Sequence, residues 1–426
     1  PALTRPQGAG TLPTVTADCV VLGAGPAGLG AALALARDGA RVTLVEAADA
    51  PGGLCRTRAR DGLRYDLGGH IPFVRDARRR EWLRDLLRDG LVWVPRPVSS
   101  VRDGRVRRGR YLDQRAGGNR EVRDADAGAA DASAAEVLPA LFGARLVESE
   151  MRTYLEKIDG VPLRRIPAAR PLRLMRDQAA PDGFWFPRGG IGRLMEAMAG
   201  RAAEAGAEVR LGTRVAALHH DAGGVTGVTL EGDGGRRHVA APHVVVALPA
   251  GAALRLLDPP HPAPPSVPMR AVCLVYVRVA GEPMTDEAWI QVDDPSIPFA
   301  RVFEMGNWDP GMADGRGGAV GMECYCDAGA GDPLWGLDDA TLTRRCVAAL
   351  VRLGWLDDPA RATPLEVVRM PGAYPLPDLA HLAAATAAPR LLAALDGVHL
   401  APGSEVLAAV EAGERAAAAV ALGRRG

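Results

Sequence analysis

Three glycines near the start of the chain have the spacing of a turn that binds a diphosphate. They follow the apolar run Cys19–Leu22, which has the right length for a buried parallel strand. Gly23 permits a tight turn, Gly25 allows the backbone to approach a pyrophosphate, and Gly28 allows the next helix to pack close to the strand. That helix, predicted at about 26–38, directs its N-terminal N–H groups at the phosphates.

An acidic residue completes this unit. The helix is predicted to end at Gly39, and a second strand, Val42–Val45, runs into Glu46. This carboxylate lies about 20 residues past the glycines, where such an acid binds ribose hydroxyls. A glycine-rich turn alone is weak evidence, but strand, helix, second strand and acid in this order predict a dinucleotide-binding unit.

A second glycine pair indicates which dinucleotide is bound. Gly52 and Gly53 follow Glu46 at a short interval, and Arg56 and Thr57 come next. This stretch resembles the second signature of FAD enzymes in the amine oxidase, protoporphyrinogen oxidase and phytoene desaturase superfamily. The resemblance implies FAD as the cofactor, with the glycine pair close to its pyrophosphate and ribityl chain.

Further blocks resemble the same superfamily, in the same order along the chain. Tyr65–His70 is similar to the segment that passes beside the isoalloxazine ring. Tyr154–Gly160 resembles a Tyr-x-x-Lys-x-aromatic-Gly element of protoporphyrinogen oxidase-like and UDP-galactopyranose mutase-like proteins. Pro187–Gly192 is followed by Thr213–Val215, whose valine backs the adenine in this family. Ala408–Ala417 looks like the family's terminal helix, whose N-terminus points at the flavin pyrimidine oxygen.

The resemblance assigns the cofactor contacts residue by residue. The predicted FAD-binding residues are Gly23, Gly25, Pro26, Ala27, Gly28, Glu46, Ala47, Gly52, Gly53, Leu54, Arg56, Thr57, Gly68, Gly69, His70, Ile71, Val215, Gly403, Ser404 and Leu407. The chain also departs from the family pattern. Residues 403–407 contain no aromatic residue, which argues against a simple monoamine oxidase, and no cysteine, so the FAD is expected to be noncovalent. Asp159 stands where the family usually has an aromatic residue, and a C-terminal stretch of the mutases is shortened to 401–404.

Four residues are candidates for catalysis, each with a structural alternative. His70 could relay protons or polarise a bound oxygen, or be held by backbone hydrogen bonds without chemistry. Glu405 could bind an amine or act as a base, or support the N-terminus of the last helix. Lys157, the single lysine, is more simply an ion-pair or capping residue than a substrate ligand. Tyr374 is a pocket residue or a core tyrosine. Arg301 is by default a surface residue, with contact to an anionic substrate as the alternative.

Composition narrows the classes of function. The chain has 426 residues and a formal net charge of zero, which disfavours nucleic acid or an anionic membrane surface as the main partner. No apolar run is long enough to span a membrane, and residues 1–17 do not resemble a secretory signal. The six cysteines are scattered without metal-ligand spacing, so we expect buried thiols, no metal and a cytoplasmic protein.

The order of predicted elements favours an α/β fold with two interleaved domains. A Rossmann-type FAD-binding domain and an α+β substrate domain with a mixed sheet are predicted, the first from residues 17–75, 183–250 and 395–426 and the second from residues 76–182 and 251–394. Residues 238–248 are expected to add strand structure to the nucleotide domain, and residues 114–135 to form a mobile loop.

Together these features predict a flavin oxidoreductase of the amine oxidase-like type. Hydride would pass from a C–H bond of an amine, alcohol or saturated carbon–carbon unit to flavin N5, with O2 as one candidate acceptor. A tailoring step in secondary-metabolite biosynthesis fits the breadth of the family. Two alternatives stay open: a non-redox mutase acting on a sugar through reduced flavin, and a flavin-binding partner protein without turnover. A homodimer is compatible with the sequence.

Overall fold

The described part of the chain is long enough to define the whole architecture. The computed structural model describes residues 15–74, 76–88, 90–95, 98–102, 105–108, 132–177, 183–262, 267–329, 331–376, 378–403 and 405–423. Most of the loop predicted at 114–135 lies outside these ranges. No helix within them combines the length and the hydropathy that crossing a membrane requires.

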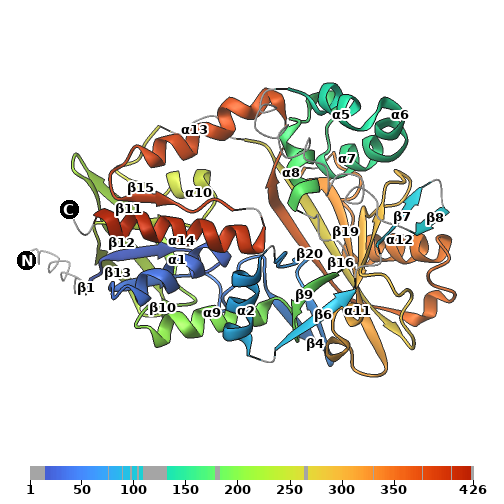
Figure 1. The fold of residues 1–426 in the computed structure, drawn as a ribbon, viewed down its shortest axis with the longest axis horizontal. Coiled ribbons are helices and arrows are strands. Elements are labelled where there is room, and N and C mark those ends of the chain that lie inside the picture. The colour runs from blue at the N-terminus through green and yellow to red at the C-terminus, as the bar shows by residue number, and fades with distance from the viewer. Residues whose placement is uncertain are drawn as a thin grey trace, which may run out of the picture.

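A five-stranded sheet forms the centre of the cofactor side (Figure 1). Its order is β10-β3-β2-β14-β21 and its pairings are parallel. The strands are β2 (Cys19–Leu22), β3 (Val42–Val45), β10 (Glu208–Arg210), β14 (Val244–Val246) and β21 (Val398–Leu400). β2, β3 and β14 are buried along their whole length, which explains their apolar sequences. The first two strands confirm the predictions at 19–22 and 42–45.

Two helices from opposite ends of the chain lie side by side over this sheet. α1 (Pro26–Arg37) connects β2 to β3, and α14 (Val406–Gly423) runs beside it, blue against red in Figure 1. A Cβ on Gly30 would lie 2.5 Å from the carbonyl oxygen of Val410, and one on Gly413 would lie 1.9 Å from that of Ala27. Glycine at both positions therefore allows a close helix contact, which brings the beginning of α14 near the first glycine turn.

The strand structure predicted at 238–248 is divided between two sheets. β13 (Gly235–Ala240) pairs with the antiparallel strand β12 (Gly224–Gly232), whereas β14 joins the central sheet. Pro242 lies between them and has no N–H for a strand ladder, so the predicted strand structure forms two separate strands. The second sheet has the order β1-β13-β12-β11-β15 and is completed by β1 (Val15–Thr16), β11 (Arg214–Asp221) and β15 (Leu257–Asp258).

A mixed sheet forms the other side of the molecule, as predicted. Its order is β20-β16-β19-β18-β17-β7-β8, with β17 and β7 parallel and the other pairs antiparallel. The strands are β7 (Val98–Arg102), β8 (Arg105–Arg108), β16 (Met269–Ala280), β17 (Trp289–Val292), β18 (Arg301–Glu304), β19 (Gly317–Asp327) and β20 (Ala362–Pro375). α12 (Asp339–Arg352) packs on one face, where Leu342 and Leu350 join the core.

Helices and short hairpins complete the fold. A helical group in teal and green at the upper right of Figure 1 packs around its own apolar cluster. It contains α5 (Ala134–Phe142), α6 (Ala144–Leu146), a π-helical turn (Val147–Met151), α7 (Arg152–Asp159) and α8 (Ala169–Asp177). Further helices are α2 (Ala77–Leu87), α9 (Gly192–Glu204), α10 (Ala250–Leu254), α11 (Met305–Trp308) and α13 (Leu382–Ala393). The hairpin β4 (Thr57–Arg60) with β5 (Leu63–Asp66) and the pair β6 (Leu91–Pro95) with β9 (Gly183–Pro187) lie between the larger sheets. Short 3-10 turns cover Leu163–Arg165, Pro310–Met312, Pro359–Arg361 and Leu379–His381.

Several contacts cross the predicted domain boundaries. β6 pairs with β9, β15 pairs with β11, and α13 contacts β21. Each of these contacts joins a segment predicted for the substrate domain to one predicted for the FAD-binding domain. The α/β class is confirmed, and the exact division into two domains stays a prediction.

Candidate active site

The first glycine turn has the form of a diphosphate cradle. Gly23 has a φ of +95°, and a Cβ on Gly28 would lie 1.8 Å from the carbonyl oxygen of Gly23. A Cβ on Gly25 would meet nothing within 4 Å, so open space lies beside it. Gly25 caps α1 without a side-chain hydrogen bond and Pro26 follows, which leaves the first N–H groups of the helix for a ligand. These features fit an FAD diphosphate.

Glu46 stands at the end of β3, beside this cradle. Its carboxylate accepts hydrogen bonds from the N–H groups of Ala24 and Ala48, each at 2.9 Å. The backbone of Thr213 donates to the carbonyl oxygen of Glu46 at 2.8 Å, which brings the start of β11, with half-buried Val215, to the same edge. Glu46, Ala47 and Val215 thus lie at one edge of the cradle, and their contact with a ribose and an adenine stays a prediction.

The second glycine pair packs against the first. The N–H of Gly52 donates to the carbonyl oxygen of Ala24 at 2.7 Å, and a Cβ on Gly53 would lie 3.5 Å from Cα of Gly25. Gly52 and Gly53 have positive φ values of 119° and 58°. Arg56 donates through Nε to the carbonyl oxygen of Gly53 at 2.9 Å, and Leu54 next to it is exposed. The two glycine segments therefore form a double layer of backbone.

Asp66 organises the backbone behind the flavin segment, and sequence reasoning missed it. It is fully buried, accepts from the hydroxyl of Thr57 at 2.6 Å, and accepts from the N–H of Ile191 at 3.0 Å. The N–H of Gly192 donates to the same Thr57 hydroxyl at 2.8 Å, so this hydroxyl is used within the protein. Burial raises the pKa of Asp66 to about 7. An acid at the end of a short strand, beside the buried Tyr65, was the available signal.

Two buried side chains of the mixed sheet hold the Gly68–His70 segment. The hydroxyl of Tyr276 donates to the carbonyl oxygen of Asp66 at 2.6 Å and accepts from the N–H of Gly68 at 2.8 Å. The carboxylate of Glu323 accepts from the N–H of Gly69 at 3.1 Å. Burial lowers the pKa of His70, while Glu323 and a backbone hydrogen bond at Leu67 act in the opposite direction. His70 is half-buried, and Ile71 after it is buried.

The chain returns to this region before α14. A Cβ on Gly403 would lie 2.3 Å from Cα of Ala409, so the segment before α14 packs tightly on the helix. Leu407 is buried in the first turn of α14. Glu405 contributes to the raised pKa of the buried Cys55 thiol, after burial and Asp66, which places it near the second glycine segment. Ser404 lies outside the described residues.

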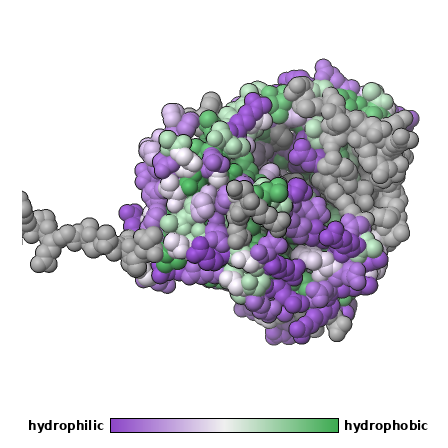
Figure 2. Space-filling view, turned by 60° about the vertical axis from the view of Figure 1, so that its left-hand side comes forward, coloured by the Kyte–Doolittle hydropathy of each residue, from purple (hydrophilic) through white to green (hydrophobic). Residues whose placement is uncertain are grey.

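Polar and aromatic side chains from five elements gather around Glu323, and this group is called the cleft below. Arg301 on β18 donates to the carboxylate of Glu323 at 3.1 Å and to the hydroxyl of Tyr154 at 3.3 Å. The hydroxyl of Tyr325 donates to Glu323 at 2.8 Å, and its ring stacks on Tyr374 with centroids 6.2 Å apart. Tyr374 is 40% exposed, and desolvation raises its pKa. Figure 2 shows a hollow in one face of the molecule.

Arg170 adds a second cation to this cleft. It interacts electrostatically with Tyr325 and Tyr374 and pairs with Asp159 at 3.2 Å. Its side chain is 33% exposed, whereas that of Arg301 is 16% exposed. Arg301 is therefore not the surface residue that the sequence suggested by default. Of the four predicted catalytic residues, His70 and Tyr374 lie on either side of the Glu323 network.

Comparison with known proteins decides the family. The family model described as FAD dependent oxidoreductase matches residues 18–307, more than half of the chain. The chain belongs to this family. FAD is therefore its cofactor, as the cradle and the terminal helix indicate.

Relatives of this flavoprotein include carotenoid enzymes. It is 28% identical over 339 residues to a phytoene dehydrogenase of Streptomyces griseus, covering 67% of this chain and 64% of that one. It is also 28% identical over 264 residues to a zeta-carotene-forming phytoene desaturase of Myxococcus xanthus, covering 50% of each. The matches span about two thirds and one half of these relatives' lengths.

Solved structures share the fold over nearly the whole flavoprotein. Reduced UDP-galactopyranose mutase superimposes with a TM-score of 0.74 at 19% identity, covering 96% of both chains. Cyclohexylamine oxidase from Brevibacterium oxydans gives a TM-score of 0.68 at 20% identity, covering 96% of this chain and all of the other. At these identities the similarity establishes the fold alone.

In this flavoprotein Lys157 has a structural environment. Its Nζ donates to the carbonyl oxygens of Val292, Asp294 and Phe299 at 2.9, 2.8 and 2.7 Å, which uses all three N–H donors of an ammonium group. Burial lowers the pKa of Lys157 to about 8. These contacts support the structural alternative for Lys157, which clamps α7 to the loop after β17.

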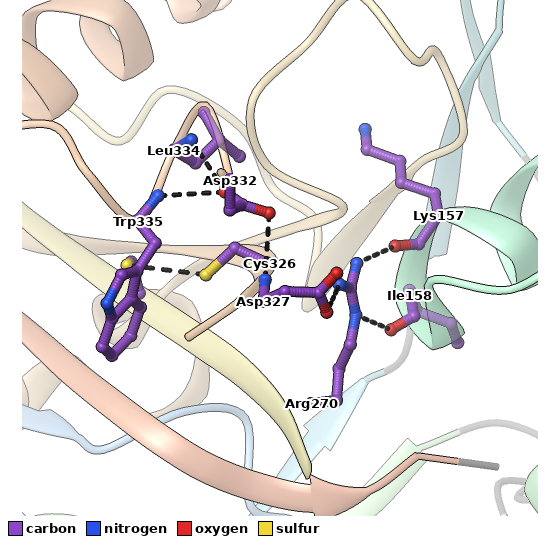
Figure 3. Close-up of polar contacts among 9 residues, drawn as sticks. Lys157, Ile158, Arg270, Cys326, Asp327, Asp332, Leu334 and Trp335 are labelled. Atoms are coloured by element: carbon purple, nitrogen blue, oxygen red, sulfur yellow. Dashed lines mark hydrogen bonds and ion pairs between the residues drawn. The ribbon is translucent and has the colours of Figure 1, made fainter. Parts of the chain in front are cut away.

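The side chain of Arg270 occupies the space beside Gly160, which explains why a glycine follows α7. It donates to the carbonyl oxygens of Lys157 and Ile158, each at 3.2 Å, and to the carboxylate of Asp327, while the ammonium group of Lys157 points away (Figure 3). A Cβ on Gly160, which has a φ of +73°, would lie 2.6 Å from Cζ of this arginine. Tyr154, Lys157 and Gly160 thus have separate tasks: the first faces Arg301, and the others anchor the helix.

The cysteines are free and buried, as predicted. Cys273 and Cys326 have sulfur atoms 3.8 Å apart, and Cys324 and Cys346 have sulfur atoms 3.7 Å apart. Figure 3 includes Cys326 at the edge of the Arg270 network. Within the described ranges no group of three or more His, Cys, Asp or Glu side chains is arranged to hold a metal ion.

Proposed function

We propose that this flavoenzyme oxidises a small polar molecule that carries an anionic group, at an amine, alcohol or saturated carbon–carbon unit. The observation that carries the proposal is the polar cleft of Arg170, Arg301 and the tyrosines, adjacent to the Gly68–His70 segment. Bound FAD supplies a hydride acceptor, and O2 is one candidate for the acceptor that restores it. A tailoring step on a secondary metabolite is consistent with such a site.

Binding is assigned to the more exposed cation of the cleft. The side chain of Arg170 pairs with Asp159, and a third of it remains accessible. A guanidinium group with free donors can bind a carboxylate or phosphate through paired hydrogen bonds. Arg301 is more fully used because Glu323 and Tyr154 occupy both of its terminal nitrogens. The stacked rings of Tyr325 and Tyr374 provide the adjoining wall.

Proton handling is assigned to His70. Because burial lowers its pKa, the imidazole is neutral at neutral pH and can accept a proton from an O–H or N–H group while the neighbouring C–H bond is broken. Glu405 near the second glycine segment is kept as a secondary candidate for binding a substrate amine.

The cleft chemistry separates this proposal from the activity of the carotenoid relatives. A long polyene has no group to pair with a guanidinium, and placing it against Arg170 and Arg301 would desolvate both without compensation. The similarity to the two phytoene enzymes therefore supports the redox class and the cofactor better than it supports their substrate.

A mutase acting on a nucleotide sugar is the second candidate. It is favoured by the two arginines with three tyrosines, and by the match to reduced UDP-galactopyranose mutase over 96% of both chains. A flavin-binding partner without turnover is less favoured, because it gives no reason for a desolvated cleft beside His70.

Anaerobic reduction of the bound flavin tests the proposal. The purified yellow protein is mixed without O2 with carboxylated or phosphorylated amines and alcohols, and with matched compounds lacking the anionic group. Loss of the oxidised flavin absorbance is expected with the anionic members alone. If no compound bleaches the flavin, while dithionite-reduced protein converts a nucleotide sugar without net oxidation, the mutase is the correct function.

A further inference from the structure

One carboxylate connects the two sides of the active site. Glu323 lies on β19 and is 4% exposed. One of its oxygens accepts from the N–H of Gly69 at 3.1 Å. The other accepts from Arg301 at 3.1 Å and from the hydroxyl of Tyr325 at 2.8 Å. Glu323 therefore contacts the flavin segment with one oxygen and the cleft with the other.

The same carboxylate approaches the imidazole of His70. A Cβ built on Gly68 would lie 3.5 Å from Oε1 of Glu323 and 3.6 Å from Nε2 of His70. The two side chains thus converge on one point above Gly68, where a buried negative charge would stabilise an imidazolium ion.

The charged groups that act on His70 come from two neighbouring strands. Glu323 on β19 favours the protonated imidazole and Arg301 on β18 opposes it, and burial opposes it as well. Trp308 and Phe303 are the other side chains closest to Gly69, and neither titrates. Burial is therefore the largest influence on His70, and the Glu323–Arg301 ion pair adds two opposing charges to it.

We propose that Glu323 is a positioning residue, which fixes Gly69 and His70 beside the flavin and stabilises the protonated form of His70 against the opposing charge of Arg301. The proposal rests on the proposed function for its catalytic meaning, because His70 is the proton acceptor there. The effect of Glu323 on the protonation of His70 can be measured without any substrate turnover.

Opposite shifts in two variants test this inference. The imidazole pKa of His70 is measured by NMR titration of the FAD-loaded protein, with its signal assigned through His70→Gln. Glu323→Gln keeps the size and an acceptor for Gly69 but removes the charge, so we expect the pKa to fall by about one unit. Arg301→Gln leaves Glu323 uncompensated, so we expect the pKa to rise.

A matched acid on the same strand is the control. Asp327 also pairs with an arginine but lies in the Arg270 network outside the cleft, so Asp327→Asn should leave the pKa of His70 unchanged. Equal values in wild type, Glu323→Gln and Arg301→Gln, or shifts in the same direction, would overturn the inference. If Glu323→Gln does not fold, the variants Glu323→Asp and Arg301→Gln still show in which direction each charge shifts the pKa of His70. The proposed function fails separately, when no substrate reduces the flavin although these shifts are observed.

Discussion

The cofactor cradle and the cleft beside it are built in different ways. The cradle consists of backbone. Its glycines lie within one short stretch, and the absence of a side chain allows their close contacts and positive φ values: Gly23, Gly25, Gly28, Gly52 and Gly53. The cleft consists of side chains from α7, α8, β18, β19 and β20, which are far apart in sequence. A backbone site can be recognised from spacing, whereas a side-chain site depends on how distant elements pack.

The largest expected effect is on the cradle. Gly28→Ala places a Cβ 1.8 Å from the carbonyl oxygen of Gly23, so the turn and α1 cannot keep their positions. We expect FAD affinity to fall by at least about 100-fold, equivalent to about 3 kcal/mol. Flavin absorbance after purification and calorimetric titration of FAD measure this loss.

Gly200→Ala is the matched control for this change. Gly200 lies inside α9, and a Cβ there would meet nothing within 4 Å. Alanine in a helix interior is favoured over glycine by up to about 1 kcal/mol. This variant should therefore keep its FAD and unfold at a slightly higher denaturant concentration. Normal FAD binding by Gly28→Ala would show that the first turn does not hold the diphosphate.

The features that could be predicted from the sequence belong to the backbone cradle, and those that were missed belong to the side-chain cleft. The strands at 19–22 and 42–45 were found because buried parallel strands are short apolar runs bounded by turn residues. Glu323 was missed because it stands in an otherwise apolar strand whose neighbours, Arg301 and Tyr325, are set by sheet register. Arg301 was assigned to the surface by default for the same reason.

The second expected effect concerns the cleft. Arg170→Gln removes the proposed ligand of an anionic substrate, and a hydrogen bond to a charged group contributes about 1.5–3 kcal/mol. We expect KM to rise by about 10- to 100-fold with a smaller change in kcat. Arg173→Gln, on the exposed side of the same helix, should change neither constant. If Arg170→Gln leaves KM unchanged, Arg170 does not bind the anionic group of the substrate.

A third variant asks whether Lys157 belongs to the scaffold. Lys157→Met leaves three carbonyl oxygens without their donor, so we expect the free energy of unfolding to fall by about 2–3 kcal/mol. Lys157→Arg should recover only part of this loss, because a planar guanidinium cannot donate to three oxygens that converge on one point. Denaturant unfolding measures both. Full stability in Lys157→Met with lost turnover would instead assign Lys157 to catalysis.

The last variant tests the buried acid between the two regions. The pKa of Asp66 is raised from 3.8 to about 7, so the folded protein retains a proton that the unfolded chain releases. Its contribution to stability is complete below about pH 4 and is lost as the pH rises through 7, at up to about 1.4 kcal/mol per pH unit. Asp66→Asn should remove this slope from the pH dependence of unfolding, whereas Asp233→Asn, an exposed change, should not. An identical slope in wild type and Asp66→Asn would mean that Asp66 is ionised in the fold, and its two hydrogen bonds from Ile191 and Thr57 would then be charge-assisted contacts that outweigh burial.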